Sequence, residues 1–198
     1  MPARATERDL VVEAAAECFA EAGIAATTVD EIARRAGISR ASVYRYVGGK
    51  QKLVSEVVLR EAVDVVEHLH NETGRVTSTD DILRVFVSEA IRVIQQRPVL
   101  SRAVGPDLHI TIPDLTYEIS MMPVLLEGIL SVLMPLRGQV LVPDAEERLV
   151  IIVEEVIRFV IARITTPTLD GRARDPAAAG ERAVAVFGPA LAQLAVGS

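Results

Sequence analysis

The sequence predicts an all-α protein, and three observations support this fold class. Apolar residues recur every three to four positions in one segment after another, which is the period of a helix with one buried face. Capping residues, glycines and prolines separate these segments, as helix start and stop signals do. Half of the 198 residues are apolar, but only 4% are aromatic and none is Trp. This composition favours helices of Ala, Val, Leu and Ile over a β-sandwich.

The expected architecture is a small helical domain over residues 1–52 and a larger one over residues 53–198, with about nine helices in all. A chain of this length can bury a real core. The formal charge of −6 divides unevenly, with +1 on residues 1–52 and −7 on the remainder. The larger, acidic part is therefore not expected to bind a polyanion.

The first expected helix covers residues 7–22, with Leu10, Ala14, Cys18 and Phe19 on its inner face. Free cysteines are usually buried, so Cys18 is expected in the core rather than as a redox sensor. One cysteine also excludes an intramolecular disulfide, which favours a reducing compartment. The N-terminus lacks a signal-peptide pattern, and no apolar run approaches the roughly 20 residues of a membrane span. We therefore expect a cytoplasmic protein.

Two short helical patterns joined by a tight turn follow in residues 27–53, TTVDEIARRAGISRASVYRYVGGKQKL. Thr28 and Glu31 form a T-x-x-E capping box at the start of the first pattern. Gly37 supplies the left-handed residue that commonly ends a helix, and Ser39 suits the N-cap of the next one. The spacing predicts a helix-turn-helix.

Every charged residue between Ile32 and Ser55 is basic, although the protein as a whole is acidic. The second helix, residues 40–46, is expected to bury Val43 and Val47 and to expose its arginine, serine and tyrosine side chains. A helix fits the major groove of B-DNA, which is roughly 12 Å wide, where arginine pairs with guanine and hydroxyls bind phosphate. These features indicate a DNA-binding domain. A solvated basic surface over ordinary core helices is the alternative.

Residues 27–53 closely resemble the DNA-binding domain of the TetR family of one-component bacterial transcriptional regulators. The resemblance covers about the first quarter of the chain, and beyond it only length and helical pattern match. Many family members carry an aromatic residue where Val47 stands and Ser or Asn where Gly49 stands; Val still fills a core, and Gly is an acceptable N-cap. The DNA-binding residues expected from the pattern and from the resemblance are Thr28, Ser39, Arg40, Ala41, Ser42, Tyr44, Arg45, Tyr46 and Lys50.

One long helix is expected over residues 50–73, running from the basic patch into the acidic part. A shift at its far end would move the second helix of the helix-turn-helix. His68 and Glu72 lie one turn apart on it, but they lack a third ligand at a useful spacing. They are therefore expected to be exposed charges rather than metal ligands.

Further helices are expected over residues 79–96, 99–104, 144–165 and 176–196, and after a capping pattern at Thr111. The 144–165 helix is apolar over so wide an arc that it needs a core on one side and a partner on the other. Paired with the last helix, it would form the four-helix dimer interface that the resemblance also implies. A two-fold dimer reads two DNA half-sites about 34–36 Å apart. The candidate interface residues are Val153, Ile157, Val160, Ile161, Phe187, Leu191 and Leu194.

The acidic part is expected to hold a cavity for a small, largely apolar ligand among its middle helices. Flexible methionines adapt to varied apolar ligands, and a few polar groups would orient the ligand. Packed core is the alternative for each of these side chains. The candidate lining residues are Phe86, Ile94, Leu100, Val104, Leu108, His109, Tyr117, Met121, Met122, Leu125 and Ile129.

No catalytic, cofactor or metal motif is present, so we expect neither an enzyme nor a bound cofactor. The favoured function is a sequence-specific DNA-binding regulator, a repressor that its ligand releases from the operator DNA. Such a ligand must bind the DNA-incompetent dimer more tightly than the competent one. A transcriptional activator, a ligand-independent DNA-binding protein of the same fold and, less favoured, a helical small-molecule-binding protein remain open.

Overall fold

The computed structural model describes residues 6–111, 127–132, 145–166 and 175–194, and all regular secondary structure within these ranges is helical. The predicted all-α class is confirmed. Contacts divide the chain into two compact units. Unit 1 contains Met1–Ala62 and Arg97–Ile119, and unit 2 contains Val63–Gln96 and Ser120–Ser198. A segment that follows α5 belongs to unit 1, because its short helix packs with the first helix of the chain.

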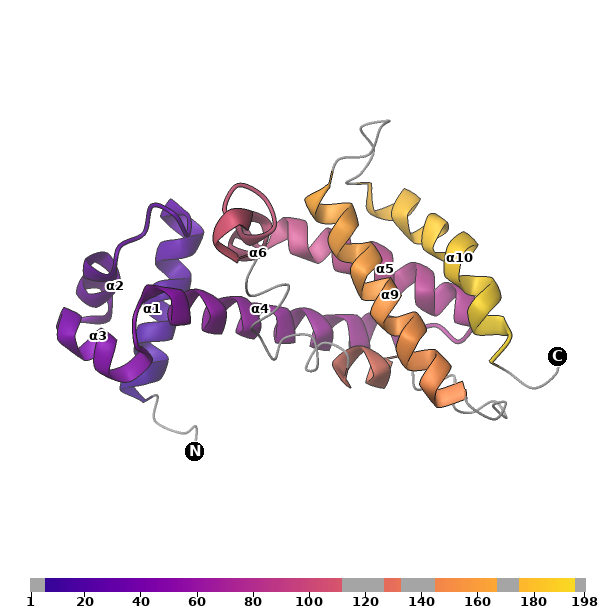
Figure 1. Ribbon diagram of the computed structural model, residues 1–198, viewed down its shortest axis with the longest axis horizontal. Coiled ribbons are helices and arrows are strands. Elements are labelled where there is room, and N and C mark those ends of the chain that lie inside the picture. The colour runs from indigo at the N-terminus through magenta and orange to yellow at the C-terminus, as the bar shows by residue number, and fades with distance from the viewer. Residues whose placement is uncertain (1–5, 112–126, 133–144, 167–174, 195–198) are drawn as a thin grey trace. The chain divides into compact units, whose positions relative to one another are not determined.

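Unit 1 begins with three helices, α1 (Glu7–Ala22), α2 (Val29–Ala36) and α3 (Arg40–Val47), shown in Figure 1. Each of the three contacts the other two. Apolar burial holds such a small bundle together, because each helix offers one apolar face. The core side chains of this bundle and of the adjoining start of α4 include Phe19, Ile24, Ile32, Val43, Leu53 and Val54, all without exposed area.

The inner face of α1 differs from the prediction at one position. Leu10 is 49% exposed, whereas Ala14, Cys18 and Phe19 are buried as expected. Val11 and Val12 are buried in its place. Three consecutive apolar residues leave the face of a helix ambiguous, and here packing against α2 and α3 selects the side that carries the two valines.

Helix α4 (Lys50–Thr73) has the predicted bounds. It contributes its first part to unit 1 and the remainder, from Val63, to unit 2. At 1.5 Å per residue, a helix of this length extends about 36 Å. Its buried apolar residues include Leu53, Val57, Val58, Ala62, Val65 and Leu69.

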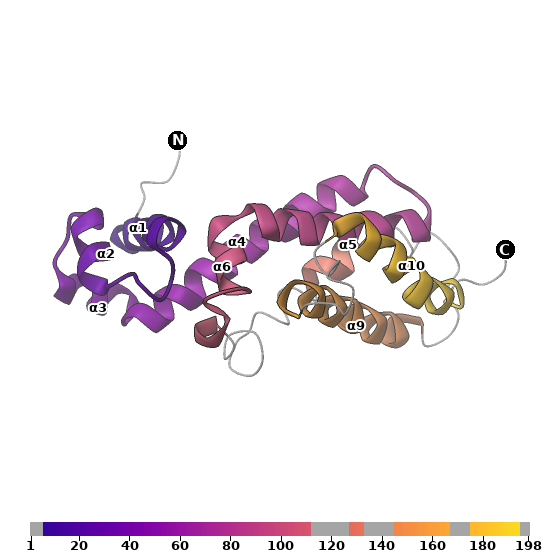
Figure 2. The same cartoon turned by 90° about the horizontal axis from the view of Figure 1, so that it is seen from above.

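The other element of unit 1 is the short helix α6 (Pro98–Ala103), which contacts α1 (Figure 2). Pro98 opens this helix at its first position, where the missing N–H of proline costs nothing. A turn at Gly105 leads into a further segment that ends, within the described residues, at Thr111. The Thr111 hydroxyl donates a hydrogen bond of 2.5 Å to the Ala103 carbonyl, which ties this segment back to α6.

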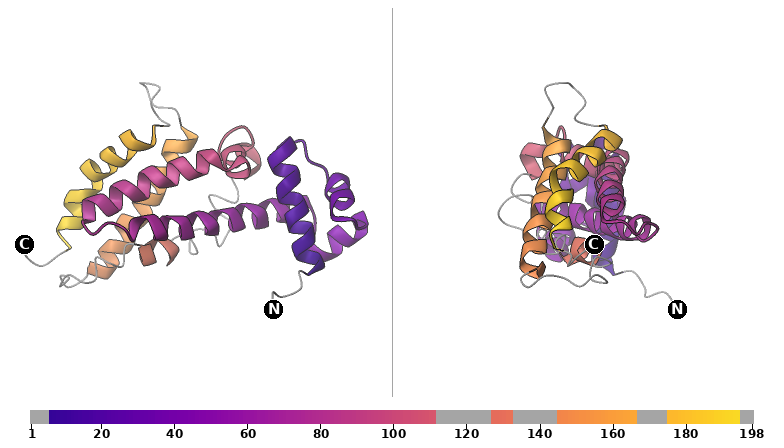
Figure 3. Two further views of the ribbon diagram at one scale, coloured as in Figure 1. Left: turned by 180° about the vertical axis from the view of Figure 1, so that it is seen from behind. Right: turned by 90° about the vertical axis from the view of Figure 1, so that its right-hand side faces the viewer.

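Unit 2 contains α5 (Thr79–Gln96), α9 (Ala145–Thr165) and α10 (Pro176–Ala192), and α10 lies alongside α5 (Figure 3). The Phe159 and Phe187 rings join α9 to α10 in a T-shaped contact with centroids 5.6 Å apart. At the start of α5, the Ser78 hydroxyl accepts the Asp81 N–H at 3.1 Å. Among the described helices, none is long and apolar enough to cross a membrane.

Candidate nucleic-acid interface

The turn between α2 and α3 has the predicted helix-turn-helix geometry. Gly37 lies in the left-handed region at φ 70° and ψ 26°, and its N–H donates to the last carbonyls of α2. Ser39 then caps α3 by accepting the Ser42 N–H at 3.1 Å. At the other end of α2, the Thr28 hydroxyl accepts the Glu31 N–H at 3.3 Å, and the Glu31 carboxylate accepts the Thr28 N–H at 2.7 Å. Both ends of α2 are therefore held by local hydrogen bonds.

Helix α3 separates its side chains as the sequence predicted. Val43 and Val47 are buried, while Arg40, Ala41 and Arg45 are exposed. Tyr44 is 45% exposed and is one of the few large apolar side chains left so open. Ser42 and Tyr46 are half-buried, and Ser39 is exposed. The predicted reading face of α3 is therefore open to a partner.

Each exposed arginine of α3 lies against a tyrosine of the same helix. The Arg40 guanidinium lies 5.7 Å from the Tyr44 ring centroid, and that of Arg45 lies 4.7 Å from the Tyr46 centroid. Arg45 Nη2 also donates to the Tyr46 hydroxyl at 2.8 Å. Cation–π contacts of this kind hold a long side chain in fewer rotamers, which lowers the entropy lost on binding.

Arg40 has a second partner in Asp30 of α2, to whose Oδ2 its Nη1 donates at 3.1 Å. Hydrogen bonding to the Tyr44 hydroxyl, with the Asp30 charge second, raises the pKa of the Arg40 guanidinium above its ordinary value. The ion pair is exposed on both sides, so it costs little to exchange for another anion.

Thr28 and Lys50 are already engaged within the unit. The Thr28 hydroxyl donates to Glu31 Oε2 at 2.8 Å, and this bond and the backbone bond to Thr28 lower the pKa of Glu31. Lys50 Nζ donates to the Ala25 carbonyl at 3.0 Å, which ties the start of α4 to the turn between α1 and α2. An ammonium has three donors, so this bond leaves Lys50 with capacity for an anion.

Arg35, which the sequence placed on the outside of α2 among the basic residues, forms ion pairs within unit 1. Its Nη1 and Nη2 donate to the two Glu21 carboxylate oxygens at 2.8 and 2.5 Å, and Glu17 lies 3.4 Å away. These bonds raise the pKa of Arg35 and lower that of Glu21. Arg35 thus joins α2 to α1 rather than adding to the open basic surface.

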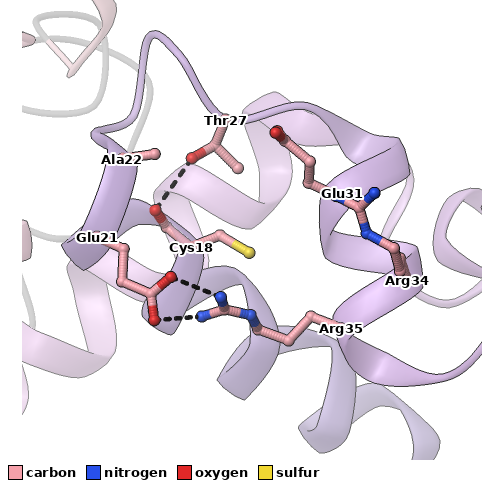
Figure 4. Close-up of a pocket in the computed structure, with 7 residues that line it drawn as sticks. All are labelled: Cys18, Glu21, Ala22, Thr27, Glu31, Arg34 and Arg35. Carbon is pink, nitrogen blue, oxygen red and sulfur yellow. Dashed lines mark hydrogen bonds and ion pairs between the residues drawn. The ribbon is translucent and has the colours of Figure 1, made fainter.

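A cavity of about 140 Å³ lies between α1 and α2 beside this pair (Figure 4). Cys18 lines it and is buried, as predicted, and burial raises the pKa of its thiol. The Thr27 hydroxyl donates to the Cys18 carbonyl at 3.1 Å across the cavity wall. The remaining lining residues are Glu21, Ala22, Glu31, Arg34 and Arg35.

The expected ligand-lining residues are distributed over both units, and four of them lie outside the described residues. Phe86, Leu100 and Ile129 are buried, whereas His109 is exposed. Ile94, Val104 and Leu108 are half-buried. Leu100, Val104, Leu108 and His109 belong to unit 1, and Phe86, Ile94 and Ile129 belong to unit 2. Tyr117, Met121, Met122 and Leu125 lie outside the described residues.

Most of the expected dimer-interface residues are covered within a single chain. Five of them have little or no exposed area, and only Ile161 and Phe187 are half-buried. A side chain already in the core has no further area to bury against a partner. The five are Val153, Ile157, Val160, Leu191 and Leu194. The open apolar side chains of these helices are instead Ile151 at 56% and Val186 at 55% exposure.

His68 and Glu72 were expected to be exposed charges, but both are half-buried. His68 Nε2 lies 3.1 Å from Glu89 Oε2 on α5, and Glu89 also accepts from Arg92. In the part of the chain that the structure describes, no group of three or more His, Cys, Asp or Glu side chains is arranged to hold a metal ion.

Asp107, a buried carboxylate of unit 1, was not among the predicted site residues. It accepts hydrogen bonds from the Ile24 and Ala25 N–H groups, on a turn more than eighty residues earlier. The only local signal for Asp107 was its position directly after Gly105 and Pro106. No sequence pattern indicates that its hydrogen-bond donors lie 83 and 82 residues away.

Comparison with known proteins agrees with this geometry. Residues 11–57 match the family model for bacterial regulatory proteins of the tetR family. An uncharacterised HTH-type transcriptional regulator from Mycobacterium tuberculosis is 29% identical over 103 residues, which cover 51% of each chain. The alignment thus spans about half the length of this relative.

Two crystal structures share the fold over nearly the whole chain. The TetR family repressor AlkX from Dietzia sp., implicated in biodegradation of n-alkanes, has a TM-score of 0.69 at 21% identity and covers 96% of this chain and 98% of its own. RolR in complex with the ligand resorcinol has a TM-score of 0.65 at 19% identity and covers 93% of this chain and 90% of its own. Residues 11–57 therefore match the helix-turn-helix domain of the tetR family, and the chain shares the fold of these two TetR-like structures.

Proposed function

We propose that the protein is a sequence-specific DNA-binding regulator that inserts α3 into the major groove of its operator. The observation that carries this proposal is the exposed arginine- and tyrosine-bearing face of α3 over a buried Val43 and Val47. Arg40 and Arg45 provide guanidinium groups for guanine or phosphate, and the tyrosine hydroxyls suit phosphate oxygens. Ala41 is small enough to contact a thymine methyl group.

Local charge supports the same proposal. The chain carries a net −6, so a random exposed face would repel DNA. Every charged residue between Ile32 and Ser55 is basic. Of these, Arg35 is neutralised by Glu17 and Glu21. The exposed charges of α3 are therefore the natural contact for a polyanion.

Binding is tested with a duplex selected from random-sequence DNA by the unmodified protein. Arg45→Ala and Tyr44→Ala are each expected to weaken that duplex by about 1–3 kcal/mol, roughly 5–150-fold. Arg75→Ala is the matched control, because Arg75 is an exposed arginine of unit 2 paired with Glu72. Equal affinities for all three variants and the unmodified protein would refute the assignment of α3.

We further propose that the protein acts as a homodimer through the outer faces of α9 and α10. Ile151 and Val186 are large apolar side chains left open there, and exposed apolar area commonly marks an interface. The exposed side of α10 also carries small apolar residues, among them Ala185 and Pro189. A two-fold pair would present two copies of α3 to successive half-sites.

Val186→Glu tests the dimer without disturbing the protomer core. Light scattering is expected to show a dimer for the unmodified protein and a monomer of unchanged helicity for the variant. Ile157→Glu serves as the contrasting change, because Ile157 is buried and a charge there is expected to unfold the protomer. An unmodified protein that is monomeric at micromolar concentration would rule out this proposal.

The third part of the proposal is that a small, largely apolar ligand releases the protein from its operator, so that it acts as a repressor. AlkX is a TetR family repressor, RolR binds the ligand resorcinol in its crystal structure, and this chain shares their fold. Thermal-shift screening with aromatic and aliphatic compounds would find candidates. A compound that raises Tm is expected to weaken operator binding by roughly 5–150-fold; a stabilising compound that leaves operator affinity unchanged is not the inducer.

A further inference from the structure

Asp107 is a buried carboxylate whose hydrogen-bond donors lie far away in the sequence. It is 6% exposed. Its Oδ2 accepts the Ile24 N–H at 2.9 Å, and its Oδ1 accepts the Ala25 N–H at 3.4 Å. Both amides belong to the turn between α1 and α2. A carboxylate is costly to bury without such bonds, so the segment after α6 is held firmly to this turn.

Arg102 contacts the same region from α6. Its Nη2 donates to the Glu21 carbonyl in the last turn of α1 at 3.4 Å. Helix α1 has no basic residue of its own in that turn, and a cation there is favoured by the helix dipole. Gly23 leaves room for these contacts, because a Cβ on it would lie 2.8 Å from Arg102 Nη1 and 3.4 Å from Asp107 Oδ2.

The turn that Asp107 holds leads directly into the DNA-binding helices. Lys50, at the start of α4, bonds the Ala25 carbonyl, and the Thr27 hydroxyl bonds the Gly23 carbonyl at 2.7 Å. The next residue, Thr28, is the N-cap of α2, and α3 packs against α2. A displacement of the turn therefore displaces the start of α2 and, with it, the support of α3.

We propose that Asp107 is a positioning residue for DNA binding, which acts from outside the helix-turn-helix by fixing the α1–α2 turn. The inference rests on the proposed DNA binding and adds a point of regulation to it. The segment that carries Asp107 follows α5, so any change that withdraws this segment releases the Ile24 and Ala25 amides and weakens operator binding. Asp107 itself is not a DNA contact.

The direction of the change in operator affinity distinguishes a positioning role of Asp107 from an effect of its charge on DNA. Replacing Asp107 with Asn removes one negative charge, which by long-range electrostatics should strengthen binding to any polyanion. Loss of the amide-binding carboxylate should instead weaken binding to the operator. A decrease in operator affinity therefore cannot arise from the change in net charge.

The test compares the unmodified protein, Asp107→Asn and Glu67→Gln on the duplex selected by the unmodified protein. Glu67 is an exposed carboxylate of α4 in unit 2, so Glu67→Gln matches the charge change without touching the turn. Fluorescence anisotropy measures affinity for the selected duplex and for an unrelated one. Hydrogen exchange in peptides covering residues 22–28 reports on the turn amides, and light scattering and Tm report on assembly and folding.

We expect Asp107→Asn to bind the selected duplex about tenfold more weakly, to bind the unrelated duplex at least as well, and to exchange faster at the turn. Glu67→Gln should match the unmodified protein. Unchanged operator affinity in Asp107→Asn, or weaker affinity with unchanged exchange at the turn, would overturn the inference. If the unmodified protein selects no duplex, the proposed function itself fails, which is a distinct outcome.

Asp107→Glu replaces the Asn variant if the latter melts below the assay temperature. It keeps the charge and both oxygens but adds one methylene, so the carboxylate must push the turn outward to accept the same amides. We expect Asp107→Glu to bind the operator more weakly and to exchange faster at residues 22–28. Either change without the other would overturn the inference.

Discussion

Gly49 lies against the ring of Tyr44, so closely that a Cβ at Gly49 would be 3.1 Å from Tyr44 Cε1. Gly49 also has a φ of 118°, which side-chain-bearing residues rarely adopt. Gly49, the second of the two glycines between α3 and α4, thus leaves room for the Tyr44 ring on the open face of α3. This contact gives a physical reason for glycine at a position where many TetR-family members carry Ser or Asn.

Gly49→Ser is therefore expected to destabilise the protein by about 1–3 kcal/mol and to weaken operator binding through a displaced Tyr44 ring. Urea unfolding and anisotropy measure the two effects. Gly37→Asn is the matched control. Gly37 is also left-handed, but a Cβ there would have no neighbouring atom within 4 Å, and Asn tolerates that conformation. A Gly49→Ser protein as stable as Gly37→Asn would contradict this account.

Two glycines of α10 should differ in their tolerance of alanine. A Cβ on Gly180 would lie 2.9 Å from the Arg84 backbone carbonyl of α5. One on Gly188 would meet side-chain atoms of Asp80, at 3.0 Å, and of Val184, at 3.7 Å. Backbone cannot move aside as a side chain can. Gly180→Ala is thus expected to cost about 1–3 kcal/mol, and Gly188→Ala less. Chemical denaturation of both variants measures the order, and the reverse order would show that α10 does not approach α5 so closely.

Glu89 should contribute stability that acid removes. Hydrogen bonds from Arg92, and then from His68, lower its pKa below the ordinary value of 4.5. A lowered native pKa stabilises the fold fully above the unfolded value, and this contribution is lost as the pH falls through the native one. The difference in Tm between the unmodified protein and Glu89→Gln should therefore be steady from about pH 7 to 5 and shrink below about 4.5.

The control for that series is Glu67→Gln, which changes an exposed carboxylate of the same charge. Its Tm is expected to follow the unmodified protein throughout the titration. A Glu89→Gln difference that stays constant down to pH 3 would mean that the Arg92 and His68 bonds do not form in solution.

Cys18 should be unreactive in the folded protein. Its side chain is buried, and burial raises the pKa of the thiol, so little nucleophilic thiolate forms at neutral pH. Iodoacetamide is expected to label it slowly in buffer and rapidly in denaturant, as followed by mass spectrometry. Equal rates would show that the cavity beside Arg35 admits reagents to the sulfur.

Local signals in the sequence were enough for the helix-turn-helix and for α4. The Thr28–Glu31 box, Gly37 and Ser39 act within four residues of one another, so their effect does not depend on the rest of the fold. The buried face of α4 followed from its helical period, because Leu53, Val57, Val65 and Leu69 recur at that spacing, although Val63 remains 44% exposed. The family resemblance over residues 27–53 rests on the same short-range pattern.

Tertiary packing decided the rest. Leu10 is exposed because neighbouring valines compete for the same core, and Ile157 is buried because α9 is apolar on more than one face. Asp107 meets Ile24 and Ala25 only after α6 packs on α1, and no periodicity links positions 83 and 82 residues apart. Sequence spacing specifies which side chains share a helix face. The choice of the apolar face that turns inward, and of the distant amide that a carboxylate meets, depends on the free energy of the whole packed unit.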